Sequence, residues 1–287
     1  MPQLNSIQVP LPARRRTRPV LLATAHGSRD PRAGEVLDRL VHRIRSLAPD
    51  TDVRQSYVDH MSPSISQALS SLGEEAASAV VLPLLLSAAA HSKGDIPGAI
   101  AAARVRHPGL RISYGRVLGP HALLVEALQQ QLTASGVAPE SAIVLAGAGS
   151  TDPDANGEVA KVARLLWEVR RAGPVEVGFA SATGPTVSEA VSRVRRLGYE
   201  PIAVAAYFLA PGRLLDSVAT AAAGVKLTEP LGDTDAVARL VLERYAEALA
   251  GQARMNCDCC VYRTPWPGHE QRVGALQRPH QHPEQHR

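Results

Sequence analysis

The sequence contains no apolar run long enough to cross a membrane. A membrane-spanning helix needs about 18 consecutive apolar residues, whereas the best candidate, residues 76–90, is shorter and is interrupted by Pro83. The first residues include an arginine cluster but no long apolar segment followed by a small-residue cleavage site, so the sequence shows no secretory signal. We therefore expect a cytoplasmic protein that does not associate with membranes.

Aromatic residues and cysteines are scarce. Phe, Trp and Tyr make up 3% of the 287 residues, so the chain lacks the stacking rings that single-strand nucleic-acid binders use. The net charge of +4 resides largely in the N-terminal arginine cluster and a His- and Arg-rich C-terminal segment, and no nucleic-acid-binding motif is present. We expect no nucleic-acid partner. The three cysteines, Cys257, Cys259 and Cys260, are an odd number confined to four positions, which excludes a disulfide framework.

Between the two ends of the chain, strand-like and helical patterns alternate. Short apolar runs, such as residues 20–24 and 79–86, are each followed by a loop and then by apolar residues at helical spacing. Strands that alternate with helices are typical of a parallel sheet with helices on both faces. The sequence therefore predicts an α/β fold.

The second half of the chain repeats the first. Residues 27–31 (Gly-Ser-Arg-Asp-Pro) align with residues 149–153 (Gly-Ser-Thr-Asp-Pro), 122 positions later. Pro63 aligns with Pro185 at the same offset of 122, so two separate landmarks share one register. This register indicates a duplicated α/β unit.

The duplication predicts four parts. They are a flexible leader over residues 1–19, a first repeat over 20–137, a second repeat over 138–250, and a Cys- and His-rich tail over 251–287. Two repeats in one chain provide both walls of an inter-domain cleft, which is compatible with a monomer, but the sequence does not fix the oligomeric state. A homodimer bridged through the tail is the alternative.

Three polar residues of the first repeat have no counterpart in the second. Ala148 stands opposite His26, Ser181 stands opposite Asp59, and the stretch opposite His91 contains no histidine. Each of the three follows the carboxyl end of a predicted strand, which is the edge where ligands bind in parallel sheets. Two imidazoles and a carboxylate suit a divalent ion such as Fe²⁺ or Co²⁺, and the carboxylate is alternatively a proton acceptor. A single histidine at a strand end is usually a hydrogen-bonded loop residue, but a matched pair favours a site.

Further polar groups lie beside these three. Gly27 and Ser28 offer backbone N–H groups to an anion at a helix N-terminus. Arg29 and Lys93 are candidates to bind carboxylates of a ligand, and the alternative is that both are solvated charges. His60 is predicted to be a partly exposed imidazole outside the site.

Taken together, these motifs resemble those of the sirohydrochlorin chelatases. The resemblance covers about residues 20–250 and is carried by residues 25–31, 57–59, 63–64, 83–86, 91 and 95–97. It implies two similar α/β domains with a macrocycle in the cleft between them. It also implies that a divalent metal is inserted, without ATP, into the anionic tetrapyrrole sirohydrochlorin, for cobalamin or siroheme biosynthesis.

The resemblance also implies roles for individual residues. His26 and His91 match the metal-binding and catalytic histidines of the family, and Asp59 stands where many relatives carry the longer Glu. Gly27, Ser28, Arg29 and Lys93 are then assigned to substrate binding.

The cysteines suggest a second metal-binding region. Cys257, Cys259 and Cys260, followed by several histidines, suit Co, Fe, Cu or Zn, or an Fe–S cluster with a further ligand. Some long relatives carry a similar tail, which favours Co²⁺ over Fe²⁺ as the inserted metal. A tail with only incidental metal affinity is the alternative. As a function, a metal chaperone or store built on a chelatase scaffold is the alternative to the enzyme.

Overall fold

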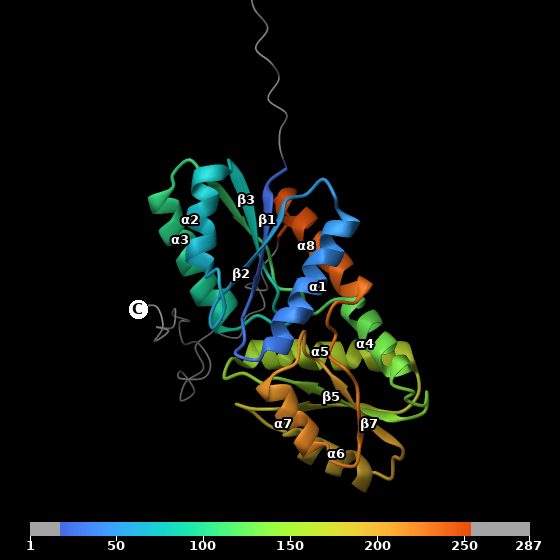
Figure 1. Ribbon diagram of the computed structural model, residues 1–287. Helices are drawn as coiled ribbons and strands as arrows, with labels where there is room; N and C mark the ends of the chain where they lie inside the picture. The colour runs from blue at the N-terminus through green and yellow to red at the C-terminus, as the bar shows by residue number, and fades with distance from the viewer. Residues whose placement is uncertain (1–17, 254–287) are drawn as a thin grey trace, which may run out of the picture.

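The computed structural model describes residues 18–253, which form two α/β lobes (Figure 1). Residues 1–17 of the predicted leader and the tail from residue 254 onward, including Cys257, Cys259 and Cys260, lie outside the described residues. Within residues 18–253, no helix is both long and apolar enough to cross a membrane.

Each lobe is built on a four-stranded parallel sheet. The first sheet has the order β2-β1-β3-β4 and consists of β1 (Val20–Ala25), β2 (Val53–Tyr57), β3 (Ser78–Pro83) and β4 (Arg111–Tyr114). The second has the order β6-β5-β7-β8 and consists of β5 (Ala142–Gly147), β6 (Val175–Phe179), β7 (Ile202–Ala206) and β8 (Lys226–Leu227). The two sheets thus have the same strand order, as a duplication requires.

Helices connect and cover the strands. In the first repeat they are α1 (Pro31–Leu47), α2 (Ile65–Glu75), the π-helix η1 (His91–Asp95), α3 (Ile96–Arg106) and α4 (Ala122–Ala134). In the second they are α5 (Pro153–Arg170), α6 (Val187–Arg196), α7 (Arg213–Ala221) and α8 (Asp235–Leu249). The predicted α/β class, with two similar parallel sheets and helices on both faces, is confirmed.

The repeat holds at the level of single residues. The first residues of β1, α1, β2 and α2 lie 122 positions before those of β5, α5, β6 and α6. Asp30 and Asp152 are equivalent N-caps, and each is followed by a proline, which suits the first helical turn. Ser64 closes a capping box with Gln67 at the start of α2. The same local sequence signals therefore start the same helices in both lobes.

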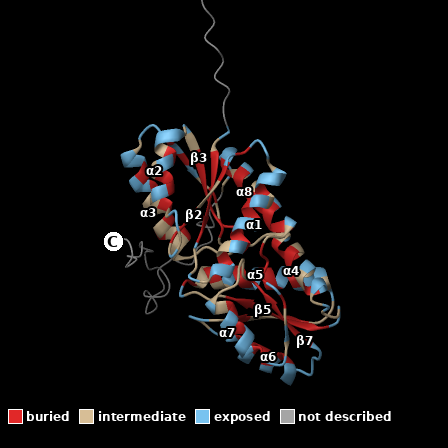
Figure 2. Cartoon of the chain, in the orientation of Figure 1, coloured by how far each residue is buried: buried red, intermediate tan, exposed pale blue. Residues whose placement is uncertain are grey.

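The buried apolar residues form three layers. Figure 2 shows buried residues along the strands and on the helices that pack against them. The outer face of the first sheet packs against α2 and α3, and the outer face of the second packs against α6 and α7. The third layer is continuous through both lobes, because it joins the inner faces of both sheets to α1, α4, α5 and α8. The two lobes therefore share one central core.

The last helix of each repeat packs in the other lobe. Helix α4 contacts α5 and β7 of the second lobe, and α8 returns to contact α1 and β3 of the first, as Figure 1 shows by the orange α8 beside the blue α1. Arg244 of α8 is buried and donates hydrogen bonds to the carbonyls of Val117 (3.1 Å) and Leu118 (2.9 Å). The predicted boundary at 137/138 therefore separates two repeats in sequence but not two packed bodies.

Candidate functional site

Three histidines meet at the carboxyl edge of the first sheet. His26 follows β1, His60 follows β2, and His91 opens η1 after β3. The ring centroids of His26 and His91 are 4.4 Å apart with the planes tilted by 55°, and those of His26 and His60 are 6.3 Å apart and nearly parallel at 16°. We call these three residues the histidine cluster.

His60 is the member of the cluster that sequence reasoning placed outside the site. Its backbone has a left-handed φ of 63°, and the equivalent Ala182 has a φ of 62°, so the local conformation belongs to the duplicated scaffold. Only the imidazole is peculiar to the first repeat. The offset that singles out His26 opposite Ala148 therefore singles out His60 in the same way.

Asp59 lies beside the histidine cluster and interacts with the adjacent His60. Its carboxylate accepts a hydrogen bond from the backbone N–H of His60 at 2.8 Å and lies 3.4 Å from His60 Nδ1. Among residues 18–253, no group of three or more His, Cys, Asp or Glu side chains is arranged to hold a metal ion. The predicted set of two imidazoles and a carboxylate is thus brought together, but it is not a preformed three-ligand site in this part of the chain.

The imidazole of His91 is oriented by Asp95, one turn further along the chain. His91 Nδ1 lies 2.6 Å from Asp95 Oδ2, and the Asp95 side chain is buried. A carboxylate at this distance favours the proton on Nδ1 and puts the lone pair on Nε2, which is the arrangement of metal-binding histidines. Both residues lie in the π-helical turn His91–Asp95, four positions apart, which places their side chains on the same face.

The environment of His26 favours its neutral form. His26 is exposed at the surface, but the protein atoms packed around its ring lower its pKa below the usual 6.5, and the charge that His91 would carry lowers it further. A neutral imidazole is the form that binds a metal ion, so His26 is suited to this role near neutral pH.

Gly27 and Ser28 shape the loop that carries His26. Gly27 has a φ of +91°, and a Cβ at this position would lie 1.8 Å from the carbonyl oxygen of Asp59. The Ser28 hydroxyl accepts a hydrogen bond from the N–H of Asp30 at 3.1 Å. A Cβ at Gly212, in the loop before α7, would lie 3.7 Å from Ser28 Oγ, so the second lobe faces this loop. Arg29 is exposed beside it.

Lys93 forms ion pairs with two carboxylates of the second lobe. Its Nζ lies 2.6 Å from Asp152 Oδ2 and 3.2 Å from Asp154 Oδ2, both at the start of α5. Burial opposes the charged ammonium, but the hydrogen bonds and charges of the two carboxylates outweigh this effect and raise the pKa of Lys93. The position lies beside His91 as expected, and the partner is the second lobe.

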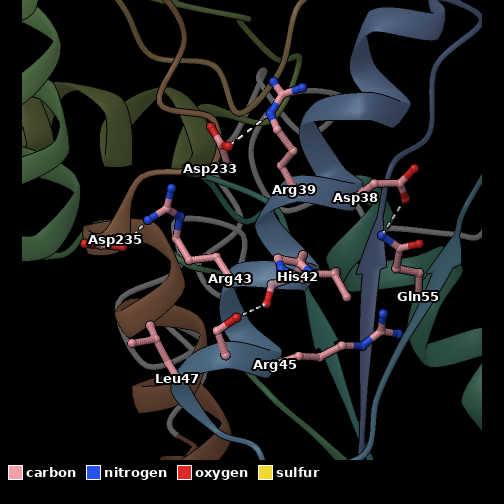
Figure 3. Close-up of a pocket in the computed structure, with 11 residues that line it drawn as sticks. Asp38, Arg39, His42, Arg43, Arg45, Leu47, Gln55, Asp233 and Asp235 are labelled. Carbon is pink, nitrogen blue, oxygen red and sulfur yellow. Dashed lines mark hydrogen bonds and ion pairs between the residues drawn. The ribbon is translucent and has the colours of Figure 1, made fainter.

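A hollow of about 830 Å³ lies elsewhere, between α1, β2 and the start of α8 (Figure 3). Arg39 pairs with Asp233, and Arg43 pairs with Asp235 across it. It contains none of the predicted site residues. The histidine cluster therefore stands apart from this hollow.

The chain belongs to the CbiX family, whose model matches residues 20–135 and 142–248. This match confirms the resemblance to sirohydrochlorin chelatases, and the matched ranges follow the two repeats.

Named relatives include enzymes for two metals. The chain is 32% identical over 262 residues to the sirohydrochlorin cobaltochelatase of Priestia megaterium, which covers 85% of this chain and 84% of that one. It is 30% identical over 200 residues to the sirohydrochlorin ferrochelatase of Bacillus subtilis, covering 69% of this chain and 77% of that one. The solved structure of SirB from Bacillus subtilis with Fe³⁺ matches with a TM-score of 0.71 and 28% identity, over 82% of this chain and 98% of that one.

Proposed function

We propose that this protein inserts a divalent metal, Co²⁺ or Fe²⁺, into sirohydrochlorin. The observation that carries the proposal is the pair of imidazoles of His26 and His91, with ring centroids 4.4 Å apart at the ligand-binding edge of a parallel sheet. Relatives named as a cobaltochelatase and a ferrochelatase support the same reaction.

The chemistry requires groups of two kinds. A divalent ion replaces two pyrrole protons of the macrocycle, so the protein must present the ion and take up protons. His26 and His91 are proposed to present the metal as neutral ligands that release it to the ring. Asp59 and His60, which lie beside them, are proposed to take up the protons.

Substrate binding is assigned to the loop after β1. Backbone N–H groups of Gly27 and Ser28 precede the N-terminus of α1, and Arg29 is exposed beside them, which suits the carboxylates of sirohydrochlorin. We place the macrocycle between this loop and the facing second lobe. Lys93 is left out of this assignment because it pairs with Asp152.

Some features of the proposal rest on the sequence. We propose that Cys257, Cys259 and Cys260 hold a metal ion or an Fe–S cluster, and that the protein is cytoplasmic, monomeric or homodimeric, and without membrane or nucleic-acid partners. Imidazole and carboxylate ligands accept both metals, and Co²⁺ is favoured.

The test is anaerobic turnover of sirohydrochlorin with Co²⁺ and, separately, with Fe²⁺, followed by the visible spectrum of the macrocycle. His26→Ala and His91→Ala are each expected to lower the rate by at least about 100-fold, because each removes a metal ligand. Truncation after Ala250 is expected to leave most of the rate, because it removes no residue of the histidine cluster.

His42→Ala is the matched control, since His42 lies on α1 in the hollow of Figure 3, and it should leave the rate unchanged. A full-length protein that binds metal but gives no rate above the metal-only blank would contradict the enzyme and favour the metal chaperone.

A further inference from the structure

The segment that carries His91 is held by the other lobe. Residues 84–95, which we call the His91 segment, connect β3 to the end of η1. The second repeat reaches this segment at three points: Glu158 at Ala88, Tyr207 at Leu86, and Asp152 at Lys93. Two of these contacts are made to backbone atoms, so they set the path of the chain whatever its side chains are.

Glu158 is a buried carboxylate whose equivalent in the first repeat is a buried apolar residue. It lies on α5, is 5% exposed, and its Oε2 accepts a hydrogen bond from the N–H of Ala88 at 2.7 Å. The residue 122 positions earlier is Val36, an apolar side chain that is buried at 7% exposure. Burial of a carboxylate is unfavourable unless a specific partner compensates for it. Packing alone therefore does not explain the carboxylate at position 158, which points to a role for its hydrogen bond to Ala88.

Tyr207 shows the same replacement. Its backbone N–H donates to the carbonyl of Ala146 just as that of Leu84 donates to the carbonyl of Thr24, so Tyr207 and Leu84 are equivalent. The buried Tyr207 hydroxyl donates to the carbonyl of Leu86 at 3.2 Å. Burial, and then the charge of Glu158, raise the pKa of Tyr207, so the hydroxyl keeps its proton and remains a donor.

The third contact uses the helix cap of α5. The side chain of Asp152 is 3% exposed and binds Lys93, whereas that of its equivalent Asp30 is 18% exposed and binds Arg32, two residues along its own chain. The same cap therefore makes a local contact in the first repeat and an inter-lobe contact in the second.

We infer that residues of the second repeat hold His91 in position. Glu158, Tyr207 and Asp152 fix the His91 segment from across the lobe boundary, and the segment in turn holds the imidazole of His91 against His26. The first repeat carries the reactive side chains, and the second repeat carries the groups that align them. This inference rests on the proposed function for its effect on turnover, but the positioning itself is measurable without substrate.

The test compares Glu158→Val and Tyr207→Phe with the unchanged protein. Glu158→Val installs the residue that the first repeat uses, and Tyr207→Phe removes one oxygen, so both variants are expected to fold with nearly unchanged midpoints of thermal unfolding. Amide hydrogen exchange in residues 84–95, above all at Ala88, should become at least about tenfold faster. The kcat of metal insertion should fall about tenfold with KM for sirohydrochlorin within about twofold, because alignment is lost while the binding loop is intact.

Glu158→Gln provides the rescue, because its amide oxygen still accepts from the N–H of Ala88, and it should restore most of the exchange protection. Arg239→Gln is the matched control. It removes an inter-lobe ion pair between Arg239 of α8 and Glu126 of α4, far along the chain from the His91 segment, and should change neither exchange in 84–95 nor kcat.

Unchanged exchange in residues 84–95 in both Glu158→Val and Tyr207→Phe would overturn the inference, whatever the activity. If Glu158→Val does not fold, Tyr207→Phe decides alone. Faster exchange in a protein that has no chelatase activity would support the positioning of His91 by the second repeat and contradict the proposed function.

Discussion

At the scale of the residue, the duplication separates what shapes the site from what reacts in it. Gly27 and Gly149 have nearly the same left-handed φ, 91° and 83°, and both pass within reach of the carbonyl that follows the neighbouring strand. His60 and Ala182 likewise share their backbone conformation. Both repeats therefore share the backbone conformation of these loops, whereas only the first repeat carries the histidines.

The acid–base behaviour of His26 gives a prediction at this scale. Its pKa in the folded protein lies below 6.5, because the side chain is partly removed from solvent and His91 opposes a second positive charge. As pH falls below about 6.5, the unfolded chain takes up a proton at this position before the folded chain does, so the free energy of unfolding decreases. Above that pH, His26 is neutral in both states and has no effect.

An NMR titration of the His26 ring should show a midpoint below 6.5, and His91→Gln should move it upward by removing the charged neighbour. His42→Gln, on α1, should leave the midpoint where it is. A midpoint at or above 6.5 in the unchanged protein would contradict the argument.

At the scale of the element, the helices show where sequence patterns stop being informative. The spacing of apolar residues predicts the helices that open at Pro31 and Pro153, and their Asp caps and prolines fix the starts. An amphipathic pattern says that one face is buried, but it does not say which sheet buries it. The packing of α4 and α8 in the opposite lobe is therefore found only in the structure.

Arg244 gives a prediction at the scale of the helix. Arg244→Met removes the donors to the carbonyls of Val117 and Leu118 and leaves both oxygens buried without them. We expect the free energy of unfolding to fall by about 2–4 kcal/mol.

Denaturant unfolding measures this loss, and Arg239→Met on the same helix is the control. Arg239 is exposed and forms a surface ion pair with Glu126, so its replacement should cost at most about 1 kcal/mol. Equal losses in the two variants would show that the contacts of Arg244 do not hold α8 on the first lobe.

At the scale of the whole molecule, the two lobes share one apolar core. Their inner faces share a continuous apolar layer, and each lobe contains a helix from the other repeat. We predict a single unfolding transition in which both lobes melt together.

Calorimetry tests this, since the van't Hoff and calorimetric enthalpies should agree. Amide exchange should also show the same maximal protection in β1 of the first sheet and β5 of the second. Two resolved transitions would mean that the lobes are independent domains, as the boundary at 137/138 implied.

Much of this molecule is readable from its sequence, because the duplication supplies an internal comparison. The fold class and the pairing of His26 with His91 follow from strand ends that share one sheet edge. The partner of Lys93 does not follow, because Asp152 is 59 residues away and belongs to the other lobe. Contacts between lobes depend on how two sheets pack, and apolar periodicity within either repeat carries no information on that packing.

The exchange of helices has a consequence for synthesis of the chain. The strands of the first sheet are translated first, but the helix that covers part of its inner face, α8, ends at Leu249. During translation, α8 is not yet available to cover the apolar residues of that face, which include Leu21 and Leu82. At about 5–20 residues per second, this delay is on the order of 10–30 seconds. We therefore expect the nascent first lobe to keep part of this apolar face exposed until the end of the second repeat emerges from the ribosome.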